Sequence, residues 1–192
     1  MSTGRILAAA LVGGLVMFIW GAFIHMAPPF AQMGLSTIPN EEGLLSQMKQ
    51  TVPANGLYFF PGRDLKNDSE AARKDWMDRM KRGPSGLLLI KPKGAEAMEP
   101  KQLVIEFVSN VICAFVLALI LARWPVSKGT AAILGLGVGL YGWMSIEVSY
   151  WNWFGYPPEF TFASAVEQIV GGLLTGLIVA LVLGKRKPQP AF

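Results

Sequence analysis

Four long apolar stretches constrain this chain more than any other feature. They cover residues 6–27, 102–122, 129–149 and 161–184. Each has roughly the 20 residues that an α-helix needs to cross a hydrocarbon layer ~30 Å thick. Only 16% of the residues are charged, whereas a soluble domain usually has about 25%. The sequence therefore predicts an all-α integral membrane protein with four transmembrane helices.

Most of the charged residues lie in one block between the first two apolar stretches. Turn and capping signals in this block predict a helix from about 40 to 51, a strand at 57–60, a second helix from about 69 to 82 and a second strand at 87–90. Because two strands alone are marginal, we expect them to pair and to pack on these helices, on the membrane body or on another subunit. The block is thus predicted to be a small α+β extracytoplasmic domain, inserted between the first and second transmembrane helices.

The predicted organisation has three parts. Residues 1–27 contain the first transmembrane helix, 28–101 form the extracytoplasmic domain, and 102–192 contain the other three helices and a C-terminal tail. The first apolar run has roughly 22 residues, whereas the apolar region of a cleaved signal peptide has about 7–15. We therefore expect the first helix to be an uncleaved signal anchor.

Positive charges beside the short connections predict the orientation. They precede the first stretch, separate the second from the third, and follow the fourth. These residues are Arg5, Arg123, Lys128, Lys185, Arg186 and Lys187. Since short positive segments stay in the cytoplasm, both termini are predicted to be cytoplasmic, and residues 28–101 and 150–160 extracytoplasmic. The expected location is a bacterial cytoplasmic membrane.

The predicted second outer connection is rich in aromatic residues. They are Tyr150, Trp151, Trp153, Phe154 and Tyr156. Trp and Tyr favour the membrane–water interface, so an interfacial anchor is the first interpretation. A surface that stacks a ligand or contacts a partner is the alternative.

Glycines recur at four-residue spacing in the last two stretches. Gly135 and Gly139 share one helix face in the third stretch, and Gly172 and Gly176 do so in the fourth. Small residues at this spacing let helix backbones approach closely in lipid. They predict packing within the helical body or against other subunits.

Four ionisable residues interrupt the apolar stretches: His25, Glu106, Glu147 and Glu167. All four fall within roughly 10 Å of the predicted outer boundary at a rise of about 1.5 Å per residue. Such groups are costly in lipid and usually face the interior of a helix bundle. They form a candidate site for a divalent metal ion or a shared proton. Alternatively, each side chain reaches water and head groups, or pairs with Lys or Arg of the outer domain.

Other sites find little support in the sequence. The single histidine rules out a zinc site with two histidines, and Cys113 is the only cysteine, so it cannot form an intrachain disulfide. The net charge of +4 does not indicate nucleic-acid binding, because basic and acidic residues are mixed in the polar block. No cofactor is indicated.

The leading functional hypothesis is non-enzymatic. The glycine faces, the aromatic connection and the small polar domain favour an accessory or scaffold subunit of a larger membrane assembly. Its expected partners are the lipid bilayer and either other membrane subunits or a second copy of the chain. The alternative is a membrane protein that binds a metal ion or a small ligand, such as a lipid or quinone, at the Glu/His cluster. An enzyme that acts on a lipid or quinone is included in this alternative.

Overall fold

The computed structural model describes residues 1–66, 68–124 and 126–184 and is mostly helical. Within these residues, four helices are long and apolar enough to cross a membrane, as the sequence predicted. They are α1 (Thr3–Met26), α4 (Pro100–Arg123), α5 (Lys128–Phe154) and α6 (Pro158–Leu183). Lys185, Arg186 and Lys187, with the rest of the predicted C-terminal tail, lie outside the described residues.

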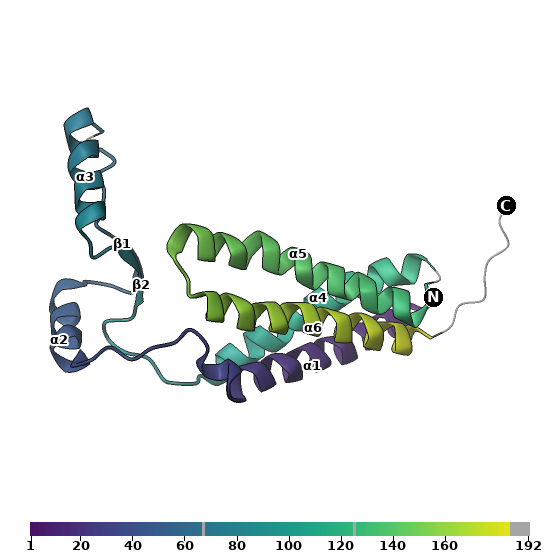
Figure 1. The fold of residues 1–192 in the computed structure, drawn as a ribbon. Helices are drawn as coiled ribbons and strands as arrows, with labels where there is room; N and C mark the ends of the chain where they lie inside the picture. The colour runs from purple at the N-terminus through teal and green to yellow at the C-terminus, as the bar shows by residue number, and fades with distance from the viewer. Residues whose placement is uncertain (67, 125, 185–192) are drawn as a thin grey trace. The chain divides into compact units, whose positions relative to one another are not determined.

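The chain divides into two compact units. The first contains Met1–Leu35 and the chain from Met98 onwards, and the second contains Ser36–Ala97. In the first unit, α1 packs against both α4 and α6, and α5 packs against α6 (Figure 1). Each of the long helices α1, α4, α5 and α6 runs antiparallel to the next one along the chain (Figure 1). The end of the bundle where α1 ends and α4 begins is called the distal end. The opposite end, where α1 begins and α4 ends, is the proximal end.

The connection between α5 and α6 is shorter than predicted. The aromatic residues 150–154 continue α5 as helix, and only 155–157 connect the two helices. Gly155, with φ of 71°, ends α5 in the left-handed conformation that glycine adopts without strain. Pro158 then lies in the first turn of α6. Backbone N–H groups in this turn have no acceptor within the helix, so a proline here removes no hydrogen bond. The predicted loop at 150–160 was therefore wrong in its bounds, because an aromatic run continues a helix as readily as it forms a loop.

The apolar core of the bundle lies at its proximal end. Its buried residues come from all four long helices: Ala9, Leu117, Ala118, Leu121, Ala131, Val179 and Leu183. Small alanines let the helices approach closely, and the larger leucines and valine fill the space between them. The distal end carries the polar residues instead, so the two ends of the bundle differ in chemistry.

Glycine contacts set the distance between α5 and α6. A methyl group built on Gly135 would overlap the carbonyl oxygen of Gly172, and one on Gly139 would overlap that of Gln168. A methyl group on Gly176 would likewise overlap the carbonyl oxygen of Ala131. The two backbones are thus in direct contact, which requires glycine at these positions.

The second unit has the predicted order of helix, strand, helix and strand. Its elements are α2 (Glu41–Thr51), β1 (Gly56–Phe60), α3 (Glu70–Arg82) and β2 (Gly86–Ile90). The strands pair antiparallel, with Leu57 opposite Leu89 and Phe59 opposite Leu87. Because side chains alternate across a strand, these four apolar side chains lie on one face of the hairpin.

This second unit lacks an apolar core. None of residues 36–66 and 68–97 is buried, and neither α2 nor α3 packs extensively on the hairpin. Leu57 remains 63% exposed and Leu89 79% exposed. An isolated two-stranded hairpin is marginally stable in water, so this unit gains little stability from its own packing.

Candidate functional site

The long helices bring the four predicted polar residues to one cavity at the distal end. This polar cavity has a volume of about 350 Å³ and receives side chains from α1, α4, α5 and α6. Its lining residues are Met17, Trp20, Gly21, His25, Glu106, Asn110, Glu147, Phe160, Ser164, Glu167 and Gln168. The sequence predicted that the four ionisable residues lie at a similar depth. In the structure all four line this cavity.

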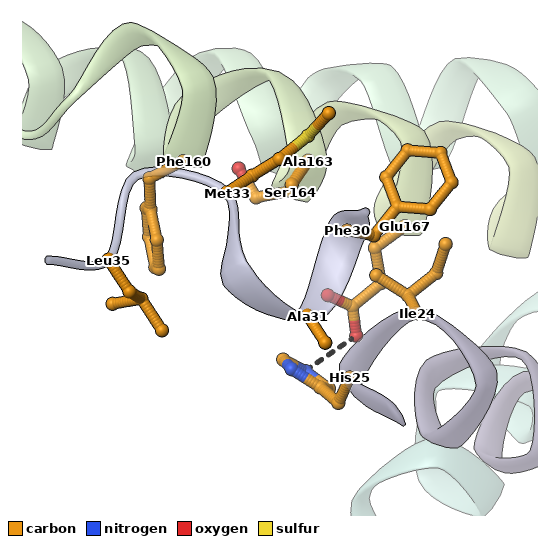
Figure 2. Close-up of a pocket in the computed structure, with 10 residues that line it drawn as sticks. All are labelled: Ile24, His25, Phe30, Ala31, Met33, Leu35, Phe160, Ala163, Ser164 and Glu167. Carbon is orange, nitrogen blue, oxygen red and sulfur yellow. Dashed lines mark ion pairs between the residues drawn. The ribbon is translucent and has the colours of Figure 1, made fainter. Parts of the chain in front are cut away.

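His25 and Glu167 form an ion pair across α1 and α6. Nε2 of His25 lies 3.3 Å from Oε1 of Glu167, as Figure 2 shows. The His25 side chain is 73% exposed and that of Glu167 only 29%. One turn earlier in α1, Nε1 of Trp20 donates to the backbone oxygen of Glu167 at 3.0 Å. This bond fixes α6 against α1 beside the pair.

The other two carboxylates have amide neighbours. Nδ2 of Asn110 donates to Oε1 of Glu106 at 3.2 Å, one turn apart in α4. Glu147 of α5 faces the side chain of Gln168 on α6. Glu167 lines the same cavity as Glu106 and Glu147, so the three carboxyl groups face one space.

A smaller cavity of about 70 Å³ lies next to the polar cavity. The two share His25, Phe160, Ser164 and Glu167, so the ion pair belongs to the wall between them. The segment after α1, which includes the short 3₁₀ helix η1 (Phe30–Gln32), lines the smaller cavity (Figure 2). Gly34, with φ of +73°, lets this segment lie directly against Phe160.

The cavity does not have the arrangement of a metal centre. Among residues 1–66, 68–124 and 126–184, no group of three or more His, Cys, Asp or Glu side chains has a geometry that could hold a metal ion. Of the predicted ligands, only His25 and Glu167 are in direct contact, while Glu106 contacts an amide. The structure therefore gives the metal hypothesis no support.

Sequence reasoning missed most of the uncharged residues that line the cavity. Met17, Gly21 and His25 recur every four residues on α1, and Phe160, Ser164 and Gln168 do so on α6. Residues at this spacing share a helix face. Their position beside the charged groups was readable from the sequence, but which faces meet across the bundle was not.

The predicted aromatic residues lie elsewhere. Tyr150 packs against Phe154 and against Tyr156, with ring centroids 5.8 and 5.3 Å apart. Trp151 contributes to an open apolar hollow of about 390 Å³ between α5 and α6, while Trp153 is 77% exposed. None of these aromatic residues lines the polar cavity.

Comparisons with protein-family models, with characterised proteins and with solved structures found no match to this chain. Function is therefore argued from the chemistry of the site.

Proposed function

We propose that this chain is an integral membrane protein that binds a small ligand in its polar cavity. One observation carries the proposal: side chains from four different helices converge on a single cavity within an otherwise apolar bundle. Polar groups at membrane depth are costly and usually mark a functional site. A volume of about 350 Å³ is also within the range of small-molecule sites.

The proposed orientation places the cavity in the outer leaflet. Arg5, Arg123 and Lys128 all lie at the proximal end of the bundle. Positively charged connections favour the cytoplasmic side, so the proximal end is assigned to the cytoplasm. The apolar core then occupies the inner half of the membrane, and the cavity faces the extracytoplasmic side.

Replacing Ser164 with leucine tests this proposal. Ser164 lines the cavity and donates only to the backbone oxygen of Thr161 in its own helix, at 3.0 Å. The larger side chain is expected to occupy cavity volume without removing a bond between helices. Native mass spectrometry of the gently purified protein should show a bound molecule on the wild type and loss of most of it in Ser164→Leu.

Ser145→Leu is the matched control. Ser145 also donates to a backbone oxygen three residues earlier, that of Gly142, at 3.2 Å, but it does not line the cavity. This variant should retain the bound molecule at the wild-type level. Equal occupancy in the wild type and both variants, or no bound molecule in any of them, would argue against a ligand site here.

A second candidate function, a subunit of a larger membrane assembly, is favoured by a different observation. The Ser36–Ala97 unit has no buried residue among those described and exposes Leu57 and Leu89 on one hairpin face. A contact with another subunit would cover these side chains and supply the missing apolar burial. The ligand site and the assembly role are compatible with each other.

Native electrophoresis of gently solubilised membranes tests the assembly role. A subunit should migrate well above the mass of one or two copies of the 20.9 kDa chain. Leu89→Ser should weaken this larger species, whereas Leu65→Ser should not, because Leu65 is equally exposed but lies outside the hairpin. Migration at the monomer or dimer mass alone would contradict the subunit hypothesis.

A further inference from the structure

The charges that line the polar cavity do not balance. Its lining contains the carboxyl groups of Glu106, Glu147 and Glu167, and His25 is the only lining residue that can carry a positive charge. His25 lies against Glu167, whereas Glu106 and Glu147 have amide neighbours that cannot neutralise a charge. Glu106 is exposed at the surface of the bundle, and Glu147 is half-buried. At the proposed depth in the membrane an unpaired carboxylate is costly, so a bound cation would stabilise this arrangement.

Asn110 adds a neutral acceptor to the same space. Asn110 is buried, with only 6% of the residue exposed, and it lines the cavity one turn from Glu106. Its Nδ2 donates to Glu106, and among the contacts of the described residues its Oδ1 accepts no hydrogen bond. A primary ammonium group has three N–H donors. Glu106, Glu147 and Asn110 all line the cavity, and each side chain offers an oxygen atom that can accept such a bond.

Apolar and aromatic residues complete the lining. Met17, Trp20 and Phe160 border the polar groups. Aromatic rings attract organic cations, and all three side chains can pack against an alkyl chain. In the described part of the bundle α4 and α5 have no extensive contact with each other. The tail of the proposed ligand is expected to extend toward lipid between these two helices.

We infer that the ligand of the polar cavity is an amphiphilic amine, with its ammonium group among Glu106, Glu147 and Asn110 and its apolar tail along Trp20 and Phe160. This inference rests on the proposed ligand-binding function. It requires no covalent step. The cation takes the place of the missing counter-charge, and the tail continues the apolar surface of the bundle.

Four probes distinguish the contribution of the ammonium charge to binding from that of the alkyl chain. Decylammonium, decanol and decanoate share a ten-carbon chain and differ in charge, while ethylammonium keeps the charge without the long tail. Binding is measured by calorimetry on the full chain in lipid nanodiscs, with titration of empty nanodiscs subtracted. We expect decylammonium to bind at least about tenfold tighter than the other three, as charged hydrogen bonds and tail burial both contribute.

The double variant Glu106→Gln with Glu147→Gln tests the carboxylates. It should weaken decylammonium binding by at least about tenfold and leave decanol binding unchanged. Retained decanol binding reports an intact cavity, so a misfolded variant is recognised. Glu159→Gln is the matched control, because Glu159 lies in the first turn of α6 and outside the cavity. It should bind decylammonium as the wild type does.

The outcomes distinguish this inference from the proposed function. Decanol or decanoate binding as tightly as decylammonium, with Ser164→Leu abolishing it, would overturn the amine but keep a ligand site. Ethylammonium binding as tightly as decylammonium would overturn the amphiphile and indicate a water-soluble amine. Binding of no probe, or binding that Ser164→Leu leaves unchanged, would overturn both proposals.

Discussion

Gly139→Leu is expected to separate α5 from α6 and to destabilise the bundle by about 3 kcal/mol, the upper end of typical overpacking costs. A methyl group at this position already overlaps the backbone oxygen of Gln168. A backbone atom in a helix cannot rotate away as a flexible side chain would, so the helices must move apart. Thermal unfolding in detergent should show a markedly lower midpoint. Decylammonium binding should fall as well, because Glu147 moves away from the cavity.

Gly137→Leu is the matched control. Gly137 is in the same helix, but a side chain built there meets no atom within 4 Å. Leucine also has a higher helix propensity than glycine, so this variant should be at least as stable as the wild type. Equal destabilisation by both substitutions would contradict this account. Glycine would then be needed for the conformation of α5 itself and not for its contact with α6.

Cysteine labelling is expected to give an all-or-none difference between the two sides of the membrane. In a Cys113→Ala background, single cysteines are introduced by Ser2→Cys, before α1, and by Ser46→Cys, in the exposed α2. A membrane-impermeant maleimide applied to intact spheroplasts should label only the cysteine at position 46. The reason is the cluster of positive residues at the proximal end, which favours the cytoplasm.

Permeabilised spheroplasts provide the control for this experiment, because both cysteines should then react. Labelling of position 2 but not position 46 in intact spheroplasts would reverse the proposed orientation. Labelling of both positions would place them on one side and contradict the membrane-spanning arrangement of α1.

The long helices were predictable because span length and apolar composition are local properties of the sequence. Capping signals were equally local: Ser69 accepts a bond from the backbone N–H of Ala72, and Pro100 lies in the first turn of α4. Asn40 precedes α2, but its side chain makes no capping bond. The end of α5 at Phe154 was missed because aromatic residues do not mark a helix end.

The site was only partly predictable. The sequence indicates how deep each residue lies in the membrane and on which helix face, but it does not indicate which residue of another helix it contacts. The depths of Glu106, Glu147 and Glu167 followed from their distance to the helix ends. Their convergence depends on how α1 and α6 pack, including the hydrogen bond from Trp20 to the backbone of Glu167. Such contacts join residues far apart in the chain, and no local pattern specifies them. The same holds for the absence of buried residues in 36–66 and 68–97.

The central claim is that the polar cavity holds an ammonium group, and a crystal structure of the full chain with decylammonium tests it most directly. The predicted result is a head-group nitrogen about 3 Å from carboxylate oxygens of Glu106 and Glu147, with the alkyl chain beside Trp20. A cavity without the head group in crystals saturated with decylammonium, or a head group bound elsewhere on the protein, would contradict the account.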